Sequence, residues 1–244
     1  MQTAFTFLFF CVKIFHRLIL NNDLLMNISW LGHSCFKVED KINGQSVTII
    51  TDPYGAELGL KVQKQKADLL TVSHSHPGHN NTDSVSGIET DGYLLFDRPG
   101  EYEAKGVFIN GIGSYHDKKQ GGERGKNIMF RLDLNGISIL HAGDLGVVLS
   151  DFQVEKIGAI DILILPVGGG TTINAREAAD IVKQIDPRII IPMHYKIDGV
   201  DAELDGVEKF KKEMGGQAEE LSKLKVSKRD LPEDEIKLII LAKA

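Results

Sequence analysis

Short apolar runs separated by polar turns fill the first half of the chain from residue 27 onward. Runs rich in β-branched and aromatic residues, bounded by Gly, Pro, Asn and Asp, are typical of strands. Asn43-Gly44 and Asn135-Gly136 are the pairs that favour tight two-residue hairpin turns. Arg98 to Tyr102 contains a Pro-Gly pair and predicts a turn. The expected strands cover residues 27–30, 35–39, 46–51, 68–72, 94–96, 107–111, 127–134 and 136–140.

After Asp144 the spacing of the apolar residues changes from that of strands to that of helices. Asn174 and Glu177 have the character of a capping box, and the apolar residues after them recur at helical intervals until Pro187. Helices are expected at 151–157, 174–186 and 205–214, and strands at 161–167, 188–192 and 236–241. A strand-rich first half followed by helix–strand alternation predicts a layered α/β protein. With no linker between the halves, residues 26–244 are expected to form a single domain.

Composition and charge narrow the function. A chain of 244 residues with 42% hydrophobic and 25% charged residues is long enough to bury a sizeable core. The net charge of −6 and the scattered Lys and Arg residues argue against a nucleic-acid partner. The two cysteines, Cys11 and Cys35, do not make a disulfide framework, and a cytoplasmic location is expected. A small-molecule substrate is therefore the expected partner, with the oligomeric state left open.

Residues 1–25 differ in pattern from the rest of the chain. Ala4 to Val12 is apolar, but Lys13 and Arg17 come after it, which is the reverse of a secretory signal. We expect an extension upstream of the true start, with Met26 as that start, because patterned strand-like sequence begins directly after it. The alternative is a helix on a membrane surface, so membrane contact is expected, if at all, only through residues 4–20.

Three histidines within six residues are the main chemical signal in the chain. His74, His76 and His79 come directly after the predicted strand 68–72. Neutral imidazole is the most common metal ligand in proteins, and side chains at i and i+2 of an extended segment point to the same side. The sequence therefore predicts a metal site at this strand end.

Three further candidate ligands stand in the same local setting. His116, Asp144 and His194 each lie just past the end of an apolar strand. Open α/β sheets gather their ligands at the carboxyl ends of strands. Five histidines and one carboxylate placed in this way can enclose one or two divalent ions.

These motifs together resemble the metallo-β-lactamase superfamily, in its branch of Zn-dependent hydrolases that includes the ascorbate-6-phosphate lactonases. The resemblance runs from about Met26 to the C-terminus. It implies a four-layer αββα sandwich with the metals between two sheets at one edge. The motifs that carry it are Trp30-Leu31-Gly32-His33-Ser34, Thr51-Asp52-Pro53, the histidine cluster, Ser114-Tyr115-His116, His141-Ala142-Gly143-Asp144 and Pro192-Met193-His194-Tyr195.

The resemblance also implies how the ligands are shared. The first metal is expected on His74, His76 and His116, and the second on His79 and His194, with Asp144 bridging both. The sequence departs from the family pattern His-x-His-x-Asp-His at position 78, where glycine replaces aspartate. Two ions that share one carboxylate leave uncompensated charge, which is costly in a buried site. We therefore expect one tight zinc ion and a weaker second ion, with manganese and iron left open.

The function expected from such a site is hydrolysis through a metal-activated water. The bond is an ester, lactone or phosphodiester in a small anionic substrate. Asp52, His141 and Asp144 are the candidate catalytic residues; Asp52 is expected to orient a metal-bound histidine. His141 is either an extra acid or base or a histidine hydrogen-bonded in the core. Arg124 or Lys126 could steer the anion.

Three points stay open from the sequence alone. His33 either lines the site or is a structural turn residue. Gly78 favours, as an alternative function, a metal-binding protein that does not catalyse. Redox chemistry at a di-iron site is a third class, but it usually needs more carboxylates than this chain offers.

Overall fold

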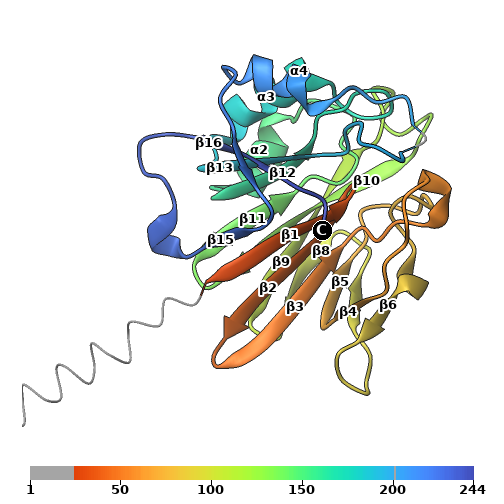
Figure 1. The fold of residues 1–244 in the computed structure, drawn as a ribbon, viewed down its shortest axis with the longest axis vertical. Coiled ribbons are helices and arrows are strands. Elements are labelled where there is room, and N and C mark those ends of the chain that lie inside the picture. The colour runs from red at the N-terminus through yellow and green to blue at the C-terminus, as the bar shows by residue number, and fades with distance from the viewer. Residues whose placement is uncertain (1–24, 201) are drawn as a thin grey trace, which may run out of the picture.

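The computed structural model describes residues 25–200 and 202–244. The predictions for residues 1–24 lie outside the described residues. The described part contains two large β-sheets that face each other, and its three α-helices lie on the outer side of one of them (Figure 1). The predicted α/β sandwich is confirmed. Among residues 25–200 and 202–244, none of the helices has the length and hydrophobicity of a membrane span.

The first sheet has six strands in the order β15-β1-β2-β3-β5-β7. A two-residue turn connects β2 to β3 through Asn43-Gly44, where both residues have positive φ, as the sequence predicts. β3, β5 and β7 run parallel, so their carboxyl ends lie at one edge. The bounds are β1 Met26–Gly32, β2 Cys35–Ile42, β3 Gln45–Thr51, β5 Leu69–Thr71, β7 Leu94–Phe96 and β15 Leu224–Val226.

The second sheet has eight strands in the order β14-β16-β13-β12-β11-β10-β9-β8. The β10–β11 hairpin turns at Asn135-Gly136, again with positive φ at both residues. β11, β12, β13 and β16 run parallel. The bounds are β8 Gly100–Ala104, β9 Val107–Tyr115, β10 Lys126–Leu134, β11 Ile137–His141, β12 Ile162–Pro166, β13 Ile189–Met193, β14 Glu219–Leu221 and β16 Lys237–Leu241.

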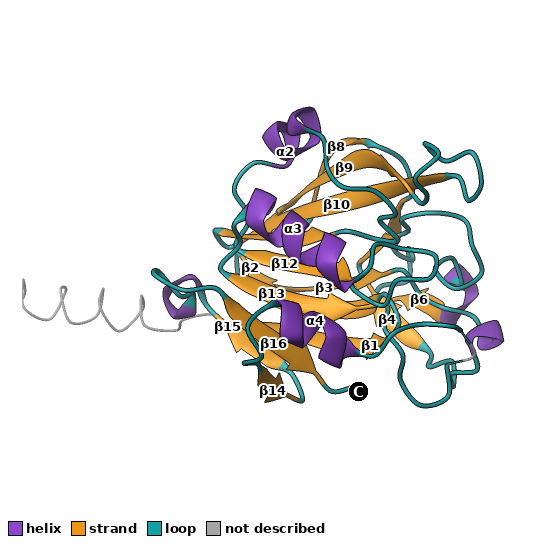
Figure 2. Ribbon diagram, turned by 90° about the horizontal axis from the view of Figure 1, so that it is seen from above, coloured by secondary structure: helices purple, strands orange, loops and turns teal. Residues whose placement is uncertain are grey.

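Capping boxes begin two of the three described α-helices, and the one at α3 is predicted by the sequence. Ser150 and Gln153 form a capping box at α2 (Asp151–Ile157), and Asn174 and Glu177 form another at α3 (Ala175–Ile185). α4 (Val207–Glu213) packs beside α3, as Figure 2 shows. Short connections include η1 (Ala56–Leu58), η2 (Thr82–Ser84), η3 (Lys228–Asp230) and a small sheet of β4 (Gln65–Ala67) and β6 (Val85–Gly87).

The core lies between the two large sheets, and alternation along the strands builds it. In β3, Ile49 belongs to the main core whereas its neighbour Ile50 belongs to a second cluster on the other face. The main core also takes in the inner face of α3 through Ala178 and Ile181. The last residues of β3 and all of β5 are therefore buried on both faces, and their carboxyl ends support the candidate site.

One predicted turn is corrected by the structure. Arg98 to Tyr102 is expected as a turn, but β8 begins at Gly100 and pairs antiparallel with β9. Glu101 and Glu103 are exposed in this edge strand, so no long apolar run marks it in the sequence. Only Arg98 and Pro99 remain outside regular structure.

Candidate metal centre

The histidine cluster lies in the loop after β5. Val72 donates its N–H to the carbonyl of Phe96, which keeps the chain extended as far as the first histidine. A turn comes next, in which the His79 N–H donates to the His76 carbonyl at 2.9 Å. His79 is buried, and His74 and His76 are partly exposed. The loop thus presents three imidazoles at the carboxyl edge of the six-stranded sheet.

The first group of ligands is the one predicted for the first metal. One ring nitrogen from each of His74, His76 and His116 lies within 4.8 Å of the others. His116 Nδ1 lies 3.1 Å from the carbonyl oxygen of Thr171, and His74 Nδ1 lies 2.9 Å from Ser73 Oγ. With their Nδ1 atoms engaged, both rings leave Nε2 for an ion.

Asp144 lies at the centre of the cluster. Its Oδ2 is 3.1 Å from His79 Nε2, 3.2 Å from both His116 Nε2 and His194 Nε2, and 3.9 Å from His74 Nε2. One carboxylate therefore reaches histidines of both predicted metal positions. This is the position that a bridging ligand requires.

The turn before Asp144 fixes the direction of its carboxylate. Gly143 has φ +57°, and a Cβ there would lie 2.4 Å from Asn127 Oδ1 and 2.6 Å from Ser73 Cβ. Only glycine fits this approach. The Asp144 N–H donates to Asn127 Oδ1 at 2.9 Å, and Ser34 Oγ lies 3.4 Å from Asp144 Oδ1.

A second group of ligands lies on the other side of Asp144. One ring nitrogen from each of His33, His79 and His194 lies within 4.8 Å of the others. His79 and His194 are the residues predicted for the second metal, and all three side chains are buried. His33, left open by the sequence, lines the site.

The side chain of Asp52 forms hydrogen bonds with the loop that carries the histidines. Its Oδ2 lies 3.1 Å from His79 Nδ1 and accepts from Ser73 Oγ at 2.5 Å, and its Oδ1 accepts from the Ser73 N–H at 2.8 Å. Asp52 is fully buried. This is the place expected of a carboxylate that orients a metal-binding histidine.

His141 lies below the cluster, in the core. It is 0% exposed, its Nε2 lies 2.8 Å from the Ser34 carbonyl oxygen, and its ring packs edge-on against Phe36. It does not line the cavity beside the histidines. The geometry therefore favours the second expectation, a histidine hydrogen-bonded in the core.

The charges of the site are strongly coupled. Burial raises the pKa of Asp144, but His194 and His79 outweigh it, so the pKa lies well below the usual range. Burial lowers the pKa of His79, yet Asp144 and Asp52 raise it to about 10. Burial and the neighbouring His79 lower the pKa of His74 to about 3, and burial with His194 lowers the pKa of His33. His33 and His74 are thus neutral near pH 7, the form that binds metals, whereas His79 would have to release its proton to an ion.

The donor set fits divalent metal ions. Within the cluster, His33 Nδ1, His74 Nε2 and His194 Nδ1 are buried and have no hydrogen-bond partner among the described residues, as is also true of His141 Nδ1 in the core. Buried polar atoms are normally satisfied, so each such atom requires an explanation. An imidazole-rich set with one carboxylate is suited to zinc and also accepts manganese or iron.

Two supporting residues are missing from the sequence prediction. Ser73 connects Asp52 to His74, and Asn127 connects Asp144 to Ser114 and Ala142 through its side chain. Asn127 is 0% exposed. A polar residue at the start of an apolar strand is the signal that could have identified it.

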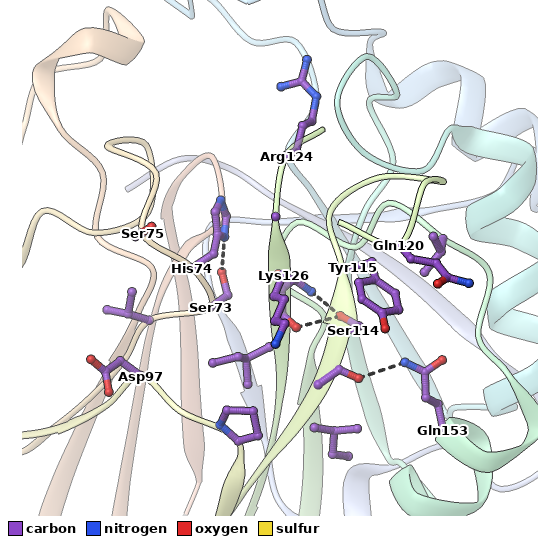
Figure 3. Close-up of a pocket in the computed structure, with 18 of the residues that line it drawn as sticks. Ser73, His74, Ser75, Asp97, Ser114, Tyr115, Gln120, Arg124, Lys126 and Gln153 are labelled. Carbon is purple, nitrogen blue, oxygen red and sulfur yellow. Dashed lines mark hydrogen bonds between the residues drawn. The ribbon is translucent and has the colours of Figure 1, made fainter. Parts of the chain in front are cut away.

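A cavity of about 1210 Å³ opens beside the first ligand group. His74 and His76 line it together with residues of β9, β10 and α2. Figure 3 shows part of this lining. Ser73 and His74 are on the left of this view, and Tyr115 and Gln153 on the right, with Lys126 between them. The cavity could admit a molecule much larger than a water.

The sequence matches known proteins over most of its length. Residues 27–194 match the family described as Beta-lactamase superfamily domain. A UPF0173 metal-dependent hydrolase of Thermoplasma acidophilum is 32% identical, over 70% of this chain and 83% of that protein. A UPF0173 protein of Pyrococcus furiosus is 31% identical, over 78% of this chain and 90% of that protein.

A solved structure from Thermotoga maritima is similar in both fold and sequence. That protein is named as a candidate Zn-dependent hydrolase of the metallo-β-lactamase superfamily. It is 35% identical with a TM-score of 0.71, covering 88% of this chain and 98% of the other. The fold, the ligand cluster and these matches agree, and the chain belongs to the metallo-β-lactamase superfamily.

Proposed function

We propose that the protein is a metal-dependent hydrolase, with zinc as its ion, that cleaves an ester, lactone or phosphodiester bond of a small anionic substrate. The observation that carries the proposal is that the ligand cluster borders a large cavity whose charged lining is mainly cationic. The names of the relatives as metal-dependent hydrolases support the class of reaction.

The lining of the cavity favours an anion. Lys118, Arg124, Lys126 and Lys156 line it, against the single carboxylate of Asp97. Lys118 pairs with Glu177. Among residues 25–200 and 202–244, the other three cations have no carboxylate within ion-pair distance. A cleft lined by one sign of charge concentrates ligands of the opposite sign.

Apolar side chains in the same cavity suit a substrate with a nonpolar portion. Ile112 and Ile128 are buried there, whereas Val148 is 49% and Phe152 71% exposed. Exposed large apolar side chains beside a pocket are typical of ligand-binding surfaces. They would also displace water from the reacting bond.

The residues of the candidate metal centre have different roles in the proposed reaction. When bound, a divalent ion lowers the pKa of a coordinated water toward about 7 and polarises the substrate oxygen. The histidines would hold the ion, Asp144 lies between the two ligand groups, and Asp52 would orient His79 through its Nδ1. Arg124 and Lys126 would bind the anionic group and direct the scissile bond toward His74 and His76.

The test compares matched substrates. Zinc-loaded protein would be assayed on pairs of ester, lactone and phosphodiester substrates that differ only in an added carboxylate or phosphate. In the Arg124→Gln/Lys126→Gln variant, KM for the anionic member is expected to rise on the order of 10-fold, because the attraction is lost. KM for the neutral member should stay unchanged.

The control removes the same charge elsewhere. Lys183→Gln/Lys209→Gln changes two exposed lysines that do not line the cavity, and KM should not change. Zinc-loaded protein that hydrolyses no member of the panel would contradict the proposal. It would favour the alternative suggested by Gly78, a metal-binding protein without catalysis.

A further inference from the structure

Gly78 leaves room for a side chain at the position where the family pattern has aspartate. A Cβ built at position 78 would lie 3.5 Å from Leu58 Cδ2 and 3.6 Å from His33 Nε2, which are ordinary contact distances. A side chain at this position would therefore begin in contact with the imidazole of His33. The place of the missing ligand is next to a histidine.

The backbone holds His33 at this place. His33 has φ +53°, an uncommon conformation for a residue other than glycine, and it lies in the turn between β1 and β2. Its carbonyl accepts from the His194 N–H at 3.2 Å and from Trp30 Nε1 at 2.9 Å. Strained residues persist where their surroundings hold them, and they gather at functional sites.

The ring of His33 faces the second ligand group. Its centroid lies 4.1 Å from that of His194 and 4.9 Å from that of His79, and the residue is 4% exposed. Its Nδ1 is buried and has no hydrogen-bond partner among the described residues. A buried, unsatisfied ring among metal-binding histidines is costly unless something binds there.

We propose that His33 replaces the missing aspartate as a ligand of the second ion, so that His33, His79, His194 and Asp144 hold that ion. Four ligands complete the tetrahedral number that zinc prefers in closed sites. A neutral imidazole in place of a carboxylate leaves this ion with one negative charge fewer around it. The inference rests on the metal centre of the proposed function and not on hydrolysis.

The experiment measures zinc content and affinity rather than activity. Protein dialysed against chelator would be titrated with zinc in a competition assay with a coloured chelator, and bound zinc would be counted by mass spectrometry. The wild type is expected to bind two ions. His33→Asn, which keeps a residue tolerant of positive φ, should weaken the second ion by at least about 10- to 100-fold and leave the first unchanged.

A rescue pair separates ligation from a structural role. Adding Gly78→Asp to His33→Asn should restore the second ion, because the carboxylate enters the position that the ring vacated. Adding Gly78→Asn, which has the same shape without the charge, should not. His76→Asn is the control for the other group and should weaken the first ion instead.

Two results would overturn the proposal. One is a His33→Asn protein that binds both ions as tightly as the wild type. The other is equal zinc affinity in the Gly78→Asp and Gly78→Asn rescue variants. If His33→Asn does not fold, the ring resonances of His33 in the wild type would be followed by NMR during zinc titration. The proposal requires that they shift when the second equivalent of zinc is added.

The two proposals fail in different ways. Two ions bound through His33 with no hydrolysis of any substrate would refute the proposed function and leave this inference standing. If the protein hydrolyses a substrate but its affinity for the second ion does not change in His33→Asn, the proposed function stands and this inference is refuted.

Discussion

At the residue scale, the ligands of the centre depend on partners that bind no ion themselves. Asp52 contacts His79 Nδ1, Ser73 Oγ and the Ser73 N–H, and it is 0% exposed. One carboxylate therefore contacts both His79 and the loop that carries His74 and His76. Carboxylates in this position fix the tautomer of the histidine and raise its basicity.

Asp52→Asn is expected to lower zinc affinity by about 10- to 100-fold, because the amide keeps the shape but loses the charge facing His79. Competition titration with a chelator measures the effect. Asp40→Asn is the matched control, since Asp40 is also a buried aspartate but bonds to Asn135, away from the ligands. Unchanged zinc affinity in Asp52→Asn would contradict the role given to this residue.

The sequence predicts some of these residues and not others, for a physical reason. The six ligands lie just past strand ends and carry a family spacing, and the structure brings all six together. His33 stands alone in a hairpin turn, so no spacing links it to His79, and only the fold places them side by side. The ligand roles of the six residues and of His33 are predictions that measurements of bound metal test.

At the scale of the elements, the parallel strands are joined at the end opposite the metal centre by Asp161. Its Oδ2 accepts from the Ser138 N–H at 2.9 Å, and its carbonyl accepts from the Ile189 N–H at 2.9 Å. β11, β12 and β13 thus meet at one residue. Lys228 Nζ also lies 2.8 Å from this carboxylate.

Asp161→Asn is expected to lower the free energy of unfolding by about 1 to 3 kcal/mol at pH 7 and to leave zinc affinity unchanged. Burial raises the pKa of Asp161, but the bonds from Lys228 and Ser138 outweigh it and hold the pKa below its ordinary value. The stabilisation is therefore present above about pH 4 and is lost as the pH falls through the lowered pKa.

Thermal unfolding of the metal-free wild type and of Asp161→Asn, at neutral and at acid pH, measures the stabilisation by Asp161. The difference between them should shrink in acid. Asp180→Asn, which breaks an exposed pair with Lys183, is the control and should change stability little. A difference that grows in acid would contradict the assignment.

Elements were predictable where the apolar pattern was long enough to show a period. The capping box at α3 and the Asn-Gly hairpins are local signals, and the structure confirms them. β14 and β15 have three residues each, which is too few to reveal a period. The sequence predicts a turn at the start of β8, because pairing with β9, and not the pattern of β8 itself, makes this segment a strand.

At the scale of the whole molecule, the metal centre joins the two large sheets. The six-stranded sheet supplies His33, Asp52 and the histidine loop, and the eight-stranded sheet supplies His116, Asp144 and His194. Ser34 and Asp144, which lie 3.4 Å apart across the sheets, are 110 residues apart in the chain. Ions bound by these residues would connect the two sheets.

Removal of metal is therefore expected to destabilise the whole protein. At free zinc 100 times the dissociation constant, a bound ion adds about 2.7 kcal/mol to the free energy of unfolding. The melting temperature should fall by about 5 to 10 °C in chelator and recover when zinc is returned. Calorimetry with and without chelator measures the change; identical melting curves would show that the ions do not bridge the sheets.

Because the predicted ligands come from both sheets, the complete ligand set exists only after the two sheets have assembled. Contacts between distant parts of a chain form late in folding, because closing long loops costs entropy before the contact is gained. The nascent chain offers only the local trio His74, His76 and His79, while Asp144 and His194 arrive once both sheets are assembled. If these residues bind ions, discrimination among competing ions is therefore expected only in the folded protein, where both sheets bring the predicted ligands together.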